Sequence, residues 1–151
     1  MLWCSLLHLA QRLLRSGNVF TATMCLAYAL YWEARSEPVR GQIAVSEVIL
    51  NRVESSQYPD DICGVVKQQS KGVCQFSYFC DGKSDKPRNH KAYLRSMYLA
   101  ELMISEGDYI TVLGKGVTHY HADYVEPYWC KSPKLEFKGK IGKHLFYSSK
   151  G

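Results

Sequence analysis

The chain has 151 residues, of which 46% are hydrophobic and 22% are charged. This length fits a single domain, and the composition excludes a disordered chain. The formal net charge of +5 suits an anionic partner. The basic residues form no block, however, and the chain has no nucleic-acid-binding motif, so we expect no nucleic-acid partner.

Residues 1–17 predict an amphipathic helix that packs on the rest of a single domain spanning residues 1–151. Its leucines recur at helical spacing: Leu2, Leu6, Leu9 and Leu13. A signal peptide matches poorly, since His8 interrupts the apolar run and no Lys or Arg precedes it. A weak signal sequence or a membrane-surface helix is the alternative. No stretch of the sequence is long enough to span a membrane.

Two longer helices are predicted next. The first begins near Thr21 or Thr23, either of which could cap it, and continues to about Arg35. The second begins at Pro38, which favours the first helical position, and continues through "VRGQIAVSEVILNRVE". Its apolar stripe consists of Val39, Ile43, Ser46, Ile49 or Leu50, and Val53. Gly41 weakens this helix by about 1 kcal/mol relative to Ala, which suggests that another segment approaches its backbone closely.

The middle of the chain combines short elements and loops. Asp60 or Asp61 could cap a short helix over "ICGVVKQQ". The following Gly-rich segment, residues 70–87, has no regular pattern, and loops of this length in compact domains are usually functional or disordered. Pro87 then opens a helix, "RNHKAYLRSMYLAELMIS", which ends at Gly107.

The C-terminal third has strand and turn composition. "YITVLG", "THYHADYV" and "HLFYS" are rich in β-branched and aromatic residues, and "LEFKGKIG" predicts a tight hairpin around Gly139. Helices therefore come first and short β segments follow. This order predicts an α+β fold dominated by helices.

Six cysteines, at positions 4, 25, 63, 74, 80 and 130, lack the spacing of paired zinc ligands. Cys74 and Cys80 flank "QFSYF" and could close a small loop in an oxidising compartment. Free buried thiols are an equally good interpretation of the sequence.

Glu33 stands where the apolar face of the first of these helices, through Leu26 and Leu30, would continue. A carboxyl on an apolar face is desolvated, which raises its pKa. A carboxyl that stays protonated near neutral pH can donate its proton to a leaving oxygen, as in glycosidases. The alternative is a buried Glu33 that pairs with Arg35, Arg52 or His119 for structure alone.

Five segments occur in one order over about residues 24–147: "LAYALYWEARSEPVRGQIAVSEVILNRV", "YPDDICGVV", "CQFSYFCDG", "VTHYHADYVEPYW" and "IGKHLFY". Together they resemble the cell-wall hydrolase family typified by the spore-cortex lytic enzyme SleB. The resemblance implies a lysozyme-like catalytic domain over residues 20–147 that cleaves peptidoglycan between N-acetylmuramic acid and N-acetylglucosamine. It also implies that Glu33, in the family's "EARGE" motif, is catalytic. The chain departs from the family pattern at Trp32 and Ser36, where a His and a Gly are common.

The resemblance leaves two mechanisms to choose between. A hydrolytic glycosidase needs a second carboxylate as nucleophile or as base for water. The candidates are Asp81, Glu37, Asp123 and Glu126, and spacing singles out none of them. In a lytic transglycosylase the 6-hydroxyl of the muramic acid attacks C1, and one Glu serves as acid and then as base. The sequence therefore favours a lytic transglycosylase over a hydrolytic muramidase.

The "CQFSYFCDG" loop is the first candidate for the substrate cleft. Gln75 and Ser77 offer hydrogen bonds to sugar hydroxyls and acetamido groups, and Tyr78 offers a stacking face. Phe76 and Phe79 fit a stacking surface and the core equally well. In the similar lytic transglycosylases, a Gln-containing motif follows the catalytic Glu and lines the cleft.

"THYHADYVEPYW" is the second candidate segment. On a strand, His119 and His121 face one way and Tyr120 faces the other. We count all three as substrate-binding candidates, and we expect one histidine, together with Tyr120, to hydrogen-bond substrate or Glu33.

Four aromatic residues near the C-terminus carry weaker signals. Tyr128 and Trp129 fit a sugar platform or the core equally well. His144 and Tyr147 are expected to be structural.

Other classes of protein fit parts of the sequence. His119, His121 and Asp123 could bind zinc in a metallo-amidase or peptidase, although no HExxH pair supports this. Cys74 or Cys80 could pair with His119 in a wall peptidase. A non-catalytic wall-binding or virion structural protein is the alternative that is not an enzyme. We expect no metal or other cofactor.

The implied substrate places the protein at the cell wall, in the periplasm or outside the cell. Because the N-terminus lacks a convincing signal peptide, release from the cytoplasm by a phage holin is one route, as for a phage endolysin. We expect a monomer that binds the peptidoglycan polysaccharide, and membrane contact through the N-terminal helix is an unfavoured alternative.

Overall fold

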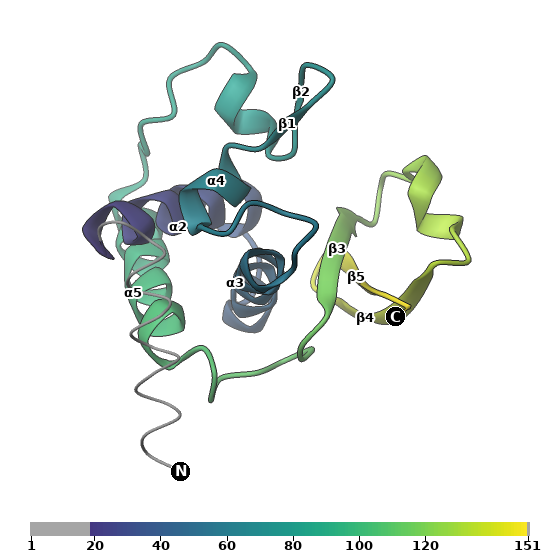
Figure 1. The fold of residues 1–151 in the computed structure, drawn as a ribbon. Helices are drawn as coiled ribbons and strands as arrows, with labels where there is room; N and C mark the ends of the chain where they lie inside the picture. The colour runs from purple at the N-terminus through teal and green to yellow at the C-terminus, as the bar shows by residue number, and fades with distance from the viewer. Residues whose placement is uncertain (1–18, 151) are drawn as a thin grey trace.

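Helices form the first part of the described chain and a small sheet forms the last part (Figure 1). The computed structural model describes residues 19–150, so the helix expected for residues 1–17 lies outside it. The helices are α2 (Val19–Ala34), α3 (Val39–Glu54), α4 (Ile62–Val66) and α5 (His90–Glu106). The predicted helix-dominated α+β fold is confirmed. Within residues 19–150, no helix has the length and apolar character needed to cross a bilayer.

α2 lies in the core because it is apolar on nearly all of its faces. Leu26 and Leu30 are completely buried, and the helix packs against α3, α4 and α5. It begins at Val19, before the predicted cap at Thr21 or Thr23. Thr23 is wrong as a cap, because its hydroxyl donates to the Val19 carbonyl oxygen from inside the helix.

α3 is the central element, in contact with the other three helices and with the C-terminal sheet (Figure 1). Every residue from Ala44 to Val53 is buried. The apolar stripe predicted from sequence is therefore too narrow, and its first member, Val39, is 47% exposed. A helix enclosed on all sides must also bury its polar side chains, which then need partners.

The start of α3 lies against the sheet. A Cβ on Gly41 would lie 3.3 Å from Cβ of Glu37, which is closer than usual, and 3.5 Å from Cγ2 of Ile141 in β4, which is an ordinary contact. Pro38 is the N-cap of the helix and not its first helical residue. Both features bring the N-terminal turn of α3 close to the last strands.

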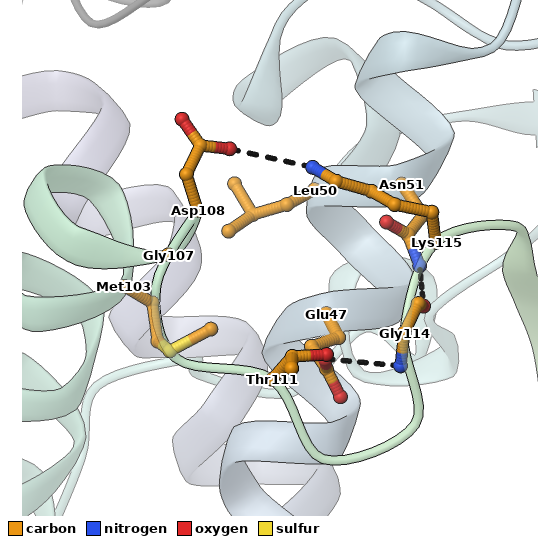
Figure 2. A pocket seen from close by; sticks show the side chains of 9 residues that line it. All are labelled: Glu47, Leu50, Asn51, Met103, Gly107, Asp108, Thr111, Gly114 and Lys115. Carbon is orange, nitrogen blue, oxygen red and sulfur yellow. Dashed lines mark hydrogen bonds and ion pairs between the residues drawn. The ribbon is translucent and has the colours of Figure 1, made fainter. Parts of the chain in front are cut away.

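Two buried polar residues of α3 hold the segment that leads into the sheet (Figure 2). The Glu47 carboxylate accepts hydrogen bonds from the backbone N–H groups of residues 112–114 and from the Thr111 hydroxyl. Asn51 Nδ2 donates to the carbonyl oxygens of Gly114 and Val117, each at 3.0 Å. The strand composition of "YITVLG" is therefore misleading, because its N–H groups bind a carboxylate and not a neighbouring strand.

The middle of the chain is more ordered than predicted. Asp61 caps α4, as one of the two predicted candidates, by accepting a hydrogen bond from the Gly64 N–H at 2.8 Å. α4 ends at Val66, and the chain then forms a small antiparallel hairpin and a short 3-10 helix. These elements are β1 (Gln69–Ser70), β2 (Val73–Cys74) and η1 (Ser77–Cys80). Lys71 and Gly72 take positive φ values of 52° and 78° at the hairpin turn, which an irregular loop would not require.

The C-terminal sheet has three antiparallel strands in the order β3-β5-β4. The strands are β3 (Val117–Ala122), β4 (Leu135–Ile141) and β5 (His144–Ser149), with η2 (Tyr128–Lys131) between β3 and β4. The hairpin predicted around Gly139 is wrong. Gly139 lies inside β4 at a register shift, and the turn comes after Ile141, because the chain continues straight through the shift.

Residues 19–150 contain two disulfides. Cys25 of α2 is bonded to Cys63 of α4, and Cys74 is bonded to Cys80 across the end of β2 and η1. Of the two interpretations that the sequence left open for Cys74 and Cys80, the closed loop is the one observed. Among the described cysteines, Cys130 is the free thiol.

Candidate active site

Glu33 lies in the last turn of α2, and its side chain lines a cleft of about 920 Å³. The cleft runs between the end of α2, the β1–β2 hairpin with the segment that follows it, and β3. Of the predicted substrate-binding residues, the structure brings five to this cleft: Gln75, Ser77, His119, Tyr120 and His121. They come from segments separated by more than forty residues in the chain, so only the fold brings them together.

The Glu33 carboxyl is partly buried and has a single hydrogen-bond donor among the described residues. Tyr120 donates its hydroxyl to Oε2 of Glu33 at 3.0 Å. Burial raises the pKa of Glu33, and this effect outweighs the Tyr120 hydrogen bond and the charge of Arg52, which lower it. A carboxyl in this environment keeps its proton to a higher pH than an exposed Glu.

The structural pairing considered for Glu33 is not found within residues 19–150. Arg35 donates instead to the Tyr31 carbonyl oxygen and stacks on the ring of Trp32. His119 Nδ1 lies 2.9 Å from the hydroxyl of Thr118. Glu33 therefore has no cationic partner that would hold it ionised by direct contact.

Trp32, adjacent to Glu33, also lines the cleft. Its indole Nε1–H donates to the Asp85 carbonyl oxygen at 2.9 Å, and its ring stacks on Tyr78 with a centroid distance of 6.3 Å. Tyr78 is buried in the core and does not line the cleft, although the sequence made it a substrate-binding candidate. It supports the Trp32 ring from behind.

The loop that follows β2 divides its residues between the cleft and the core. Gln75 and Ser77 are exposed and line the cleft. Phe76 is 2% exposed and Phe79 packs partly against the core, so the core interpretation fits both better than the stacking one. The disulfide between Cys74 and Cys80 fixes the two ends of this loop.

β3 places its side chains on alternate faces, as the sequence predicts. Tyr120 contacts His144 and Phe146 of β5 on the face that meets Glu33. His119 and His121 lie on the other face of the strand, where both rings make edge-to-face contacts with the Trp129 ring.

Neither histidine of β3 hydrogen-bonds Glu33, so Tyr120 alone meets that expectation. His121 is held from both ring nitrogens, by the Ala122 carbonyl oxygen at 2.8 Å and by the Tyr147 hydroxyl at 3.0 Å. Burial, helped by the charge of Arg52, lowers the pKa of His119, which keeps its imidazole neutral.

The zinc and thiol alternatives lack the required geometry. Within the described range, no three His, Cys, Asp or Glu side chains are placed to hold a metal ion. Asp123, the third proposed ligand, is paired with Lys140 at 2.9 Å. Cys74 and Cys80 are bonded to each other and offer no thiolate.

None of the four candidate second carboxylates lines the cleft. Glu37 accepts a hydrogen bond from the Lys143 N–H, Glu126 pairs with Lys131, and Asp81 binds the backbone of its own loop. Among the described residues that line the cleft, Glu33 is the one carboxylic acid. Among these described residues, the site therefore offers a single carboxyl for proton transfer and no second one to act as nucleophile.

Eight residues that line the cleft were not identified as site residues from the sequence: Arg52, Tyr58, Ser70, Lys71, Val73, Ala122, Tyr124 and His144. Arg52 appeared only as a possible ion-pair partner, and His144 was expected to be structural. The sequence feature that could have identified Arg52 is its position in "VILNRVE", where a charged residue follows a run of apolar residues in a helix.

Comparison with known proteins adds a family match. A family model described as Cell Wall Hydrolase matches residues 36–147, beginning just after Glu33. A spore cortex-lytic enzyme of Halalkalibacterium halodurans is 54% identical over 122 residues, and one of Oceanobacillus iheyensis is 31% identical over 122 residues. Each alignment covers 80% of this chain, but the chain spans only 33% and 39% of the two relatives.

Two solved structures share the fold. The catalytic domain of the germination-specific lytic transglycosylase SleB from Bacillus anthracis matches with a TM-score of 0.62 and 28% sequence identity. The match covers 83% of this chain and 92% of that domain. The catalytic domain of the Bacillus cereus SleB protein matches with a TM-score of 0.60, also at 28% identity, over 83% and 88% of the two chains.

Proposed function

The chain belongs to the cell wall hydrolase family, and on this basis we propose that it cleaves peptidoglycan glycan strands as a lytic transglycosylase, with Glu33 as the catalytic residue. One observation carries the proposal: Glu33 is the one carboxyl among the described residues of the cleft, and burial raises its pKa. A relative of the same fold is named a lytic transglycosylase, which agrees with a site that has a single acid.

The reaction uses Glu33 twice. Protonated Glu33 gives its proton to the glycosidic oxygen between N-acetylmuramic acid and N-acetylglucosamine, and the bond from C1 to that oxygen breaks. The C6 hydroxyl oxygen of the muramic acid then bonds to C1, and its proton passes to the Glu33 carboxylate. The product is a 1,6-anhydro sugar, no water is consumed, and Glu33 is protonated again for the next turnover.

The neighbouring residues have separate tasks in this proposal. Tyr120 holds Oε2 of Glu33 and stabilises the carboxylate that forms after proton transfer. Gln75 and Ser77 hydrogen-bond the sugar from the opposite wall. His119 and His121 support the Trp129 ring at the rim, where it offers a stacking face for a sugar.

A peptidoglycan substrate places the activity at the cell wall. We propose that the chain binds this polymer as a monomer, without nucleic acid and without a cofactor. Release to the wall by a phage holin stays a prediction from the sequence, as does membrane contact through residues 1–17.

Mass spectrometry of digested peptidoglycan tests the proposal. The wild-type chain should produce 1,6-anhydromuramic ends, and Glu33→Gln should lower the rate by about 10² to 10⁴-fold, the usual contribution of general acid–base catalysis. Reducing muramic ends would instead identify a hydrolytic muramidase. New free amines, or undiminished cleavage by Glu33→Gln, would contradict glycan cleavage by Glu33.

A further inference from the structure

Arg52 is a buried cation at the side of the cleft. Its side chain leaves the last part of α3 and is only 7% exposed, yet it lines the same cleft as Glu33. Its Nε donates to the Thr118 carbonyl oxygen at 2.8 Å, which fixes the direction of the guanidinium group. The guanidinium lies over the rings of Tyr58, 5.1 Å from the centroid, and Phe76, 5.8 Å from the centroid.

The rest of the guanidinium group is without a partner in the described part of the chain. No protein oxygen there accepts a hydrogen bond from Nη1 or Nη2 of Arg52, and no carboxylate forms an ion pair with it. Nη1 and Nη2 are not among the side-chain atoms that are fully buried without a hydrogen-bond partner. They are therefore accessible from the cleft that Arg52 lines. A guanidinium has five N–H donors, and here only one is used.

We propose that Arg52 is a substrate-binding residue whose Nη groups donate to the carbonyl oxygen of an amide substituent on the sugar next to Glu33. The inference rests on the proposed function, because it takes the glycan strand as the ligand. A hydrogen bond from a charged donor to a carbonyl oxygen in a partly desolvated cleft is among the stronger kinds. Ring hydroxyls would satisfy the same atoms less well, because a hydroxyl oxygen is a weaker acceptor than an amide carbonyl oxygen.

Two amide carbonyls of the glycan carry this chemistry. One is the acetamido group present on both sugars, and the other is the amide that joins the lactyl side chain of muramic acid to its peptide. On the muramic acid ring, the acetamido group is carried by C2, next to the C1 atom of the bond that breaks, and the lactyl group is carried by C3, one carbon further away. Arg52 would therefore fix the ring relative to the acid.

Binding of defined glycans separates the two sources. The parent is Glu33→Gln, which prevents turnover, and the probes are penta-N-acetylchitopentaose, cellopentaose and peptidoglycan glycan strands that keep their peptides. Cellopentaose is neutral and lacks the acetamido group. Adding Arg52→Gln should weaken glycan binding by about 10-fold to 100-fold, the effect of losing one charged hydrogen bond.

A selective loss supports the proposal. If Arg52→Gln weakens penta-N-acetylchitopentaose but not cellopentaose, the acceptor is the acetamido carbonyl. If it weakens only the peptide-bearing strands, the acceptor is the lactyl amide. Equal binding of all probes by the parent and Arg52→Gln, or an equal loss that includes cellopentaose, overturns the role of Arg52.

Two further variants keep the test independent of folding. Arg52→Lys, which retains a cationic donor, should recover part of the lost affinity, whereas a purely structural Arg52 would not discriminate between probes. Arg35→Gln is the matched control, because Arg35 directly follows α2, close to Glu33 in the sequence, and does not line the cleft. If the parent binds none of the glycans and the wild type releases no glycan fragments, the proposed function itself fails. If the wild type cleaves glycan normally but Arg52→Gln binds every probe as tightly as the parent does, only the inference about Arg52 fails.

Discussion

At the scale of single residues, the site depends on the balance between burial and one hydrogen bond at Glu33. Burial favours the protonated acid that must donate first. The Tyr120 hydroxyl favours the carboxylate that forms afterwards. Tyr120 is partly buried beside Glu33 and packs on Phe146 of β5. Burial and the nearby Glu33 raise its own pKa well above the usual value, so it stays a donor throughout. A single tyrosine thus adjusts the acid without competing for its proton.

Tyr120→Phe should move the pH dependence of the reaction. As general acid, Glu33 must be protonated, so kcat/KM falls as pH rises through its pKa. The Tyr120 hydrogen bond lowers that pKa. Its removal raises the pKa further, and the alkaline limb of the pH profile should shift to higher pH.

The measurement is the pH profile of kcat/KM on soluble glycan strands. Tyr147→Phe is the matched control, because the Tyr147 hydroxyl contacts His121 and not Glu33. Its alkaline limb should stay where the wild type has it. A shift of the Tyr120→Phe limb to lower pH would contradict the assigned role.

The sequence predicts the residues of this site better than their contacts. Glu33 is visible as a carboxyl on an apolar helix face, and Tyr120 follows from the alternation of a strand. Arg52 is not visible as a cleft residue, because its environment depends on α3 being enclosed on all sides by elements distant in sequence. Tyr78 is misplaced for a similar reason, since loop residues have no period that separates cleft from core.

At the scale of elements, α3 joins the helical part to the sheet through polar side chains at successive turns. Glu47, Asn51 and Arg52 bind the segment from residue 111 to residue 118. This segment leads into β3, which carries Tyr120, His119 and His121. The position of β3 relative to Glu33 therefore depends on buried hydrogen bonds as well as on apolar packing.

Glu47→Gln should destabilise the protein and misplace β3. The carboxylate accepts from three backbone N–H groups and one hydroxyl, and the amide NH₂ of Gln would face donors instead of accepting from them. Losing these charged hydrogen bonds should cost about 1–3 kcal/mol in the free energy of unfolding. Because β3 carries Tyr120, kcat/KM should fall as well.

Urea unfolding and glycan cleavage measure the two effects. Glu101→Gln is the control, since Glu101 is exposed on α5, and it should change neither. A Glu47→Gln protein with wild-type stability would show that the carboxylate does not hold this segment.

The predicted elements differ from the observed ones where local pattern and tertiary contact disagree. The helices follow from their periodicity and caps, as at Asp61. "YITVLG" has strand composition but gives its N–H groups to Glu47, and Gly139 resembles a turn residue but lies at a register shift. In both cases the deciding partner is far away in the sequence, where no local pattern can indicate it.

At the scale of the whole molecule, the two disulfides have different tasks. The bond between Cys25 and Cys63 closes 38 residues and ties α2 to α4 inside the helical part. The bond between Cys74 and Cys80 closes only 6 residues, which include Gln75 and Ser77 of the cleft. Disulfides persist in oxidising compartments, which suits a protein that acts at the cell wall. Because a longer closed loop stabilises more, we expect the bond between Cys25 and Cys63 to matter mainly for stability. We expect the bond between Cys74 and Cys80 to matter mainly for activity, because its short loop carries Gln75 and Ser77.

The double variant Cys25→Ala/Cys63→Ala should lose about 4 kcal/mol of the free energy of unfolding, because the unfolded chain regains the entropy of a long loop. Cys74→Ser/Cys80→Ser should lose only about 2 kcal/mol by the same reasoning. The second variant should nevertheless lose more activity at a temperature where both are folded, since it frees the loop that carries Gln75 and Ser77.

Urea unfolding gives the stabilities, and glycan cleavage at low temperature gives the activities. Cys130→Ser is the control for removing a thiol, because Cys130 is a free thiol in the described part of the chain, and it should match the wild type in stability. If the two disulfide variants lost equal activity when folded, the 75–77 loop would not need its closed ends. Gln75 and Ser77 would then keep their places in the cleft without the disulfide, and their contribution to substrate binding would not depend on it.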